Sequence, residues 1–253
     1  MSKRLTGRLA LVTGAASGLG RASALRFAQE GAELVLVDVN EAGLAETAAK
    51  IRAEGGTCST HRLDLAQDAD IKAFGAQFCS QHPKLDVLFN NAGIAYGEIN
   101  GPLETLSHEK WIRFLTINSL APLYLAQALR PALAKAKGVV INQSSMASFV
   151  PGVPYGVTKS TLNAITFGMA NAFGADGIRV NAIAPGIMET PANKAGLTPE
   201  TYAHVQGMQM VKLHGTAEDI AALAVFLASD DARFINCEIV SCDAGNRMRG
   251  WRS

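Results

Sequence analysis

Cysteine, long apolar runs and excess charge are all scarce in this chain of 253 residues. Its four cysteines show neither Cys-x-x-Cys spacing nor a paired histidine, so no metal site is expected. No apolar run reaches the roughly 18 residues of a membrane span, and none follows the charged N-terminus as in a secretory signal. The 23 basic and 22 acidic residues leave a net charge of +1, which gives nucleic acid no electrostatic footprint. We therefore expect a cytoplasmic protein without metal, membrane or nucleic-acid partner.

Short apolar runs alternate with amphipathic helical segments along almost the whole chain. The predicted strands span 9–13, 33–38, 57–63, 85–89, 138–142, 177–183 and 235–242, and the predicted helices span 20–30, 41–54, 67–81, 107–135, 155–175 and 216–228. This alternation predicts one α/β domain over 1–253, a Rossmann-like doubly wound parallel sheet of about seven strands with helices on both faces. The irregular segment 187–214 is too long for an ordinary connection, so we expect it to be a lid.

A glycine-rich turn joins the first predicted strand to the first helix. Gly14, Gly18 and Gly20 stand in it, and Ser17 and Leu19 lie between them. Glycine lets the main chain approach a pyrophosphate, while the helix N-terminus supplies N–H groups and partial positive charge. The turn predicts a dinucleotide site; because the spacing is G-x-x-x-G-x-G, a turn without a ligand is the alternative.

Asp38 ends the second predicted strand, 18 residues beyond Gly20. A carboxylate there can accept hydrogen bonds from the adenosine ribose, and its charge repels a 2′-phosphate. Neither Val39 nor Asn40 is basic, so the cofactor is predicted to be NAD rather than NADP. A solvated aspartate that caps a turn is the alternative.

Two further strand ends carry candidate cofactor contacts. Asp64, which precedes Leu65, could accept a hydrogen bond from the adenine amine or could cap a helix. Asn91, Ala92 and Gly93 follow the fourth predicted strand, where small residues let the main chain pass close to a ligand.

Tyr155 and Lys159 stand one helical turn apart on the predicted helix 155–175. Hydride transfer to a carbonyl leaves an alkoxide that needs a proton, and the reverse reaction needs a base. Because tyrosine has a pKa of about 10, we expect the nearby ammonium of Lys159 to lower the pKa of Tyr155 toward the working range. The alternative is an ordinary amphipathic helix with a surface lysine.

These motifs occur in a fixed order along the chain. They are TGAASGLG at 13–20, NNAG at 90–93, Asn118, Ser144 with Ser145, Tyr155 with Lys159, NAIAPG at 181–186 and DAG at 243–245. Over nearly its whole length the chain resembles the classical short-chain dehydrogenases/reductases. The resemblance implies an NAD-dependent oxidoreductase that interconverts a secondary alcohol and a ketone, assembled as a homotetramer or homodimer.

The resemblance also implies residue roles. Tyr155 is the acid/base, and Lys159 both tunes the pKa of Tyr155 and holds the nicotinamide ribose. Ser145 holds the substrate oxygen, and Asn118 belongs to a water-linked proton relay behind Lys159.

A segment after the sixth predicted strand matches the family's nicotinamide contacts. It contains Pro185, Gly186, Ile187 and Thr190, and the last two match positions that hold the carboxamide. A helix N-cap is the alternative role for Thr190.

The chain departs from the family pattern at three places. The interval from Ser145 to Tyr155 is ten residues, shorter than in many members, which leaves a choice between Ser144 and Ser145; we favour Ser145. Cys237 and Ala244 stand where the family usually has glycine, and we expect both to affect local packing rather than catalysis.

The substrate is expected to lie among 94–100, 146–154 and 188–214, with contacts from Ser145, Ala147, Tyr155 and Met188. The large apolar residues of these segments are Ile94, Tyr96, Met146, Phe149, Val150, Met188, Tyr202, Met208 and Met210. They favour a small neutral alcohol or ketone. The alternatives are a 3-oxoacyl-thioester reductase and a non-catalytic NAD-binding regulatory protein.

Overall fold

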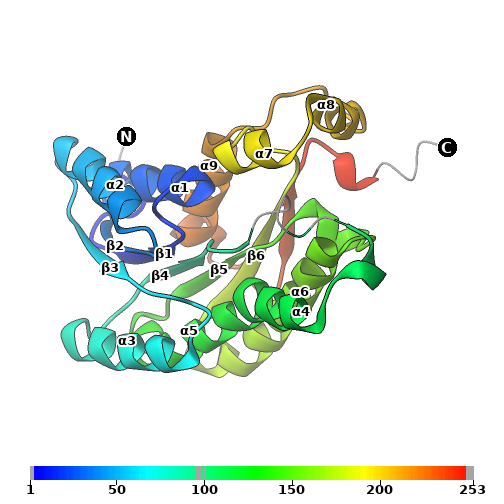
Figure 1. The fold of residues 1–253 in the computed structure, drawn as a ribbon. Helices are drawn as coiled ribbons and strands as arrows, with labels where there is room; N and C mark the ends of the chain where they lie inside the picture. Colours follow the sequence, from blue (N-terminus) through cyan, green and yellow to red (C-terminus); the bar gives the residue numbers. More distant parts are fainter. Residues whose placement is uncertain (1–2, 95–98, 100, 249–253) are drawn as a thin grey trace.

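Seven parallel strands form one sheet in the order β3-β2-β1-β4-β5-β6-β7 in the computed structural model, which describes residues 3–94, 99 and 101–248 (Figure 1). The strands are β1 (Leu9–Thr13), β2 (Glu33–Asp38), β3 (Cys58–Arg62), β4 (Val87–Asn90), β5 (Val139–Gln143), β6 (Arg179–Pro185) and β7 (Ile239–Cys242). The strand order reverses between β1 and β4, which creates the crevice where doubly wound sheets bind ligands. The predicted fold class is confirmed.

Helices cover both faces of the sheet (Figure 1). One layer contains α1 (Gly18–Gln29), α2 (Glu41–Ala53) and α9 (Ala217–Ala228), and the other contains α3 (Asp68–Gln81), α4 (His108–Leu115), α5 (Ala121–Ala136) and α6 (Pro154–Phe173). Each layer closes its own apolar core. Phe27 of α1 is buried with Leu36 of β2 on one side, and Leu129 of α5 with Val140 of β5 on the other.

Successive strand residues point to opposite cores, as a sheet covered on both faces requires. Val139 and Ile141 belong to the core under α1 and α9, whereas Val140 belongs to the core under α5 and α6. This alternation also sets the direction of the polar side chains at the end of β5.

The predicted helix 107–135 is divided in the structure. A π-helical turn, Thr116–Leu120, lies between α4 and α5 and contains the buried Asn118. π-Helical turns occur mostly as single insertions in longer helices and often at functional sites.

The last strand begins later than expected, at Ile239 rather than at residue 235. Cys237 has a φ of 65°, in the left-handed region, so the extended backbone cannot include it.

The segment 187–214 was wrongly expected to be irregular. It contains the short helices α7 (Pro191–Gly196) and α8 (Pro199–Gly207), both of which begin with proline. Thr190 caps α7 by accepting from the Asn193 amide at 3.2 Å, and Thr198 caps α8 by accepting from Thr201 at 3.2 Å. Both helices lie over the carboxyl edge of the sheet (Figure 1). Among the residues that the structure describes, no helix combines the length and apolar character needed to cross a bilayer.

Candidate active site

A cavity of about 990 Å³ follows the carboxyl ends of the central strands. It contains most of the predicted site residues, namely Gly14, Ser17, Gly18, Leu19, Asp38, Asp64, Leu65, Asn91, Ala92, Gly93, Ser145, Ala147, Tyr155, Lys159, Pro185, Gly186, Ile187, Met188 and Thr190. Contacts predicted from seven separate stretches of sequence therefore meet in one cavity. Within the described chain, no cluster of three histidine, cysteine or acidic side chains could hold a metal ion.

Gly20 and Asn118 lie outside the lining of this cavity. A Cβ on Gly20 would collide with the main-chain oxygen of Gly14 and with the Asn91 amide, so Gly20 lets α1 pack closely rather than contacting a ligand. The expectation that Gly20 is a direct cofactor contact is therefore not supported by its position.

The glycine turn has the geometry that a pyrophosphate requires. Gly14 and Gly18 have backbone φ values of 67° and 52°, which residues other than glycine rarely adopt. Ser17 precedes α1 in an extended conformation, and its side chain makes no cap hydrogen bond. The turn and the N-terminus of α1 thus present main chain to the cavity, and they fit a dinucleotide phosphate.

The Asp38 carboxylate is held against the glycine turn. Its Oδ2 accepts from the Ala16 amide at 3.1 Å, and its Oδ1 accepts from the Asn40 amide at 3.0 Å. Arg62, its register partner on β3, also lines the cavity. The fixed carboxylate suits the diol of a ribose, whereas Arg62 is the basic group that a 2′-phosphate could approach.

The end of β4 is tied to the end of β1 by reciprocal bonds. Asn91 Nδ2 donates to the Thr13 oxygen at 2.9 Å, and Thr13 Oγ1 accepts from the amides of Asn91 and Ala92 at 3.0 Å each. These contacts fix the main chain of Asn91 and Ala92 against the end of β1, next to the glycine turn.

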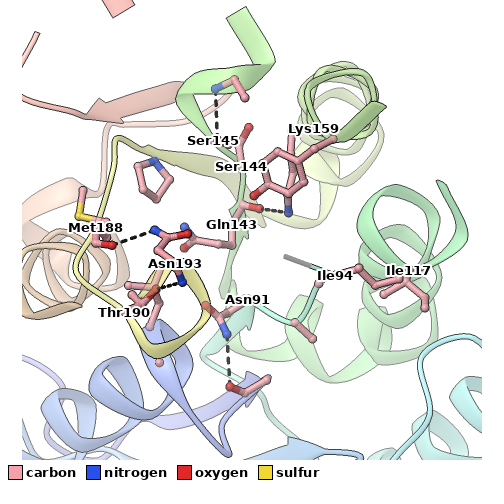
Figure 2. Close-up of a pocket in the computed structure, with 18 of the residues that line it drawn as sticks. Asn91, Ile94, Ile117, Gln143, Ser144, Ser145, Lys159, Met188, Thr190 and Asn193 are labelled. Carbon is pink, nitrogen blue, oxygen red and sulfur yellow. Dashed lines mark hydrogen bonds between the residues drawn. The ribbon is translucent and has the colours of Figure 1, made fainter. Parts of the chain in front are cut away.

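α6 brings Tyr155 and Lys159 to the same end of the cavity. Lys159 is only 3 % exposed, and its Nζ donates to the main-chain oxygen of Gln143 at 2.7 Å (Figure 2). The same Nζ lies 5.8 Å from the centre of the Tyr155 ring. A buried ammonium beside a phenol is the arrangement expected for proton transfer.

The pKa of each group differs from the expectation. Burial raises the pKa of Tyr155 to about 12, although a hydrogen bond with the Ser145 side chain opposes this rise. Burial lowers the pKa of Lys159 to about 8. The expected lowering of the Tyr155 pKa toward neutrality is not seen here, because burial, which disfavours the charged phenolate, is the largest cause of the shift.

The two adjacent serines face different partners. Ser144 Oγ donates to Asn163 Oδ1 on α6 at 2.6 Å, and its side chain is buried. Ser145 Oγ accepts from the Ala147 amide at 3.1 Å and shares a hydrogen bond with Tyr155. The geometry therefore favours Ser145 as the hydroxyl that a substrate would meet.

Asn118 is buried behind Gly93. Its Oδ1 accepts from the Ile94 amide at 2.7 Å, and its Nδ2 donates to the Ile94 oxygen and to Thr158 Oγ1 at 3.2 Å each. A Cβ on Gly93 would lie 3.0 Å from Asn118 Oδ1 and 3.5 Å from Lys159 Nζ, so both groups surround this glycine.

The substrate end of the cavity is largely apolar, as expected. Ile94, Met146, Val150, Met188 and Met208 line it, whereas Phe149, Tyr202 and Met210 do not; Tyr96 lies outside the described residues. Sequence reasoning missed Ile117 and Gln143, which also line the cavity, whereas Asn193 falls within the expected segment 188–214. A polar residue at the end of a buried strand was the available signal for Gln143.

Comparison with known proteins agrees with this geometry. A family model described as "Enoyl-(Acyl carrier protein) reductase" matches residues 14–247. The chain belongs to the classical short-chain dehydrogenase/reductase family, whose members use nicotinamide cofactors.

Three relatives illustrate the similarity. The 2,5-dichloro-2,5-cyclohexadiene-1,4-diol dehydrogenase LinX of Sphingobium indicum is 36 % identical, over 97 % of this chain and 98 % of that protein. The cyclohexanol dehydrogenase of an Acinetobacter species is 34 % identical over 93 % of each chain. The cis-4-hydroxycyclohexanecarboxylate dehydrogenase of Sinomonas cyclohexanicum is 34 % identical, over 97 % of this chain and 98 % of its own.

Two solved structures are similar over nearly the whole chain. A 7α-hydroxysteroid dehydrogenase in complex with NADH has a TM-score of 0.90 and 29 % identity, over 96 % of both chains. A structure from Beutenbergia cavernae with bound NADP has a TM-score of 0.89 and 31 % identity, over 97 % of this chain and 98 % of the other. The protein is thus an oxidoreductase of CH–OH groups.

Proposed function

We propose that this protein is an NAD(H)-dependent dehydrogenase that interconverts a secondary alcohol and a ketone, with Tyr155 as the acid/base. The observation that carries the proposal is the meeting of Ser145, Tyr155 and Lys159 in the cavity that also contains the glycine turn. The cofactor would supply or accept the hydride when it is bound, and side chains of the protein would donate or accept the proton.

The proposed roles follow from the contacts of each side chain. Ser145 holds the substrate oxygen, and the Tyr155 hydroxyl gives that oxygen its proton in reduction or takes it in oxidation. Lys159 Nζ, held by the Gln143 oxygen at 2.7 Å, places positive charge where a phenolate would develop. Asn118 and Lys159 both approach Gly93, which supports Asn118 as part of the proton relay behind the lysine.

The proposed preference for NAD rests on Asp38. Its two oxygens are fixed by main-chain amides at 3.0 and 3.1 Å, so the carboxylate cannot easily turn away from a 2′-phosphate. Arg21 does not counter this charge, because it pairs with Glu46 at 2.8 Å and donates to Thr47 at 2.9 Å. Arg62, the register partner of Asp38, does line the cavity, so the proposal requires that the charge of Asp38 outweigh that of Arg62.

The proposed substrate is a secondary alcohol on a six-membered ring. The names of the three relatives above all describe dehydrogenases of such ring alcohols. The apolar wall of Ile94, Met146, Val150 and Met208 would accept the ring, and the segment 187–214 would act as a lid over it.

A homotetramer or homodimer is part of the proposal. Ile112 on α4 is 52 % exposed and Phe167 on α6 is 45 % exposed, and subunit contact would remove both from water. Light scattering of the purified protein tests this assembly directly.

The test of function is NADH formation at about pH 9, where oxidation is favoured. NAD and NADP are supplied separately with cyclohexanol, a cyclohexadiene diol, a linear secondary alcohol and a 3-hydroxyacyl thioester. Turnover of a ring alcohol with NAD supports the proposal. The matched family model bears the name of an acyl-carrier reductase, so turnover of the thioester alone would favour the 3-oxoacyl-thioester reductase instead. NAD binding without turnover on any substrate would favour a non-catalytic NAD-binding protein.

A further inference from the structure

Gln143 is a buried polar residue at the end of β5 that the proposed contacts above do not explain. Its side chain is part of the cavity lining, and the residue is only 6 % exposed. Its Oε1 is buried and accepts no hydrogen bond from any described residue. Because an unpaired buried carbonyl is costly, the site is built to receive a hydrogen-bond donor there.

The strand geometry separates this amide from the catalytic face. The residues on either side of Gln143 point to α6, where Asn142 donates to Thr166 at 2.9 Å and Ser144, just after β5, donates to Asn163 at 2.6 Å. Gln143 lies between them and alternates to the opposite side. Figure 2 shows its side chain extending away from Lys159, toward Met188 and Asn193.

The groups on that side are already arranged by their own bonds. Asn193 donates its Nδ2 to the Met188 oxygen at 2.8 Å, and its amide donates to Thr190 Oγ1 at 3.2 Å. Thr190 therefore uses its oxygen as an acceptor and keeps its hydroxyl proton available to donate. Thr190 thus has a hydroxyl proton to donate, and Gln143 Oε1 is an unused acceptor; both residues line the same cavity.

A primary carboxamide complements this pair, because it has one carbonyl acceptor and two N–H donors. We propose that Gln143 Oε1 accepts a hydrogen bond from the carboxamide NH₂ of the nicotinamide, while Thr190 donates to the carboxamide oxygen. Gln143 is then a cofactor-orienting residue that fixes which way the carboxamide faces. This inference rests on the proposed use of a nicotinamide cofactor at this site.

The test compares three ligands by calorimetry: NAD, its 3-acetylpyridine analogue, which lacks the amide N–H, and ADP-ribose, which lacks the whole ring. The variant is Gln143→Met, which keeps the main-chain oxygen that Lys159 needs. The matched control is Gln209→Met. Gln209 is also buried, also has an unpaired Oε1, and also accepts from a lysine through its main-chain oxygen at 2.7 Å, but it lies outside the cavity lining.

The wild-type protein is expected to bind NAD about fivefold to tenfold more tightly than the acetyl analogue, as for one neutral hydrogen bond. Gln143→Met should abolish this difference, leave ADP-ribose binding unchanged, and leave the melting temperature unchanged or raised. Gln209→Met should keep the difference. Equal weakening of all three ligands in Gln143→Met, or a wild-type protein that does not distinguish NAD from the analogue, would overturn the inference. Failure of the wild-type protein to bind both NAD and ADP-ribose would instead overturn the proposed function itself.

Discussion

Lys159 and Gln143 are joined by a 2.7 Å hydrogen bond from the lysine Nζ to the main-chain oxygen at the end of β5. This bond holds the ammonium at the end of β5, and the centre of the Tyr155 ring lies 5.8 Å from the same nitrogen. A single residue, Gln143, therefore holds the lysine through its main chain while its side chain faces the other wall of the cavity. Because burial shifts the pKa of both Lys159 and Tyr155, these shifted pKa values should determine the pH dependence of the reaction.

The two directions of the reaction should respond differently to pH. Tyr155, whose pKa burial raises to about 12, stays protonated across the working range and can donate its proton to a ketone. Lys159 has a pKa lowered by burial to about 8, so its charge is present below that pH and is lost above it. We expect kcat/KM for ketone reduction to be level below pH 8 and to fall above it.

Alcohol oxidation should have a more alkaline optimum, because removal of a proton by Tyr155 requires the phenolate, which becomes commoner as pH rises. Profiles of kcat/KM measured in both directions check this expectation. A reduction rate that stays constant to pH 10, or an oxidation optimum below that of reduction, would contradict it.

Replacing Asp38 should change the cofactor preference. In Asp38→Asn the charge that repels a 2′-phosphate is lost, and the bonds to the ribose are weakened. We expect the ratio of kcat/KM for NAD to that for NADP to fall by about tenfold to a hundredfold. Asp64→Asn is the matched control, because Asp64 lines the same cavity and also accepts from a main-chain amide, that of Ala66 at 2.9 Å. An unchanged ratio in Asp38→Asn would show that this carboxylate does not select the cofactor.

Glycine at position 244 should stabilise the protein. Ala244 has a φ of 51°, in the left-handed region that is unfavourable for residues with a Cβ. Ala244→Gly should raise the free energy of unfolding by about 0.5–1 kcal/mol, and Cys237→Gly, at a φ of 65°, should act similarly. The Ala244 oxygen accepts from the amides of Met210 and Val211, so position 244 also anchors the end of the segment 187–214.

Urea unfolding measures these changes, and Gly245→Ala supplies the contrast. Gly245 has a φ of 80°, and a Cβ there would lie 2.8 Å from Met210 Cβ, so this substitution should destabilise. If Ala244→Gly and Gly245→Ala changed the free energy of unfolding in the same direction, backbone strain at these positions would not explain the changes.

Local sequence patterns were enough to predict the sheet, and together with the family resemblance they predicted most of the residues that line the cavity. Buried strands such as Leu9–Thr13 are short runs of apolar residues. The turn that follows needs positive φ values at Gly14 and Gly18, which glycine adopts more readily than any other residue. The short helix α7 escaped prediction because six residues are too few to show apolar periodicity.

Other features depend on contacts between distant segments. The pKa of Tyr155 is set by burial among packed elements, which spacing along a helix does not report. The same is true of Gln143, whose unpaired oxygen becomes apparent only when β5, Met188 and Asn193 are placed together. Sequence motifs thus predicted which side chains line the cavity, whereas the pKa values of these side chains depend on how the chain packs around them.

The central claim is that Tyr155 transfers the proton between the chain and the substrate oxygen. Steady-state oxidation of cyclohexanol with NAD, compared between the wild-type protein and Tyr155→Phe, tests it most directly, with NADH affinity measured in parallel. We predict that kcat falls by about 10²- to 10⁴-fold while NADH binds nearly as before. A Tyr155→Phe protein that oxidises the alcohol at the wild-type rate would contradict the account.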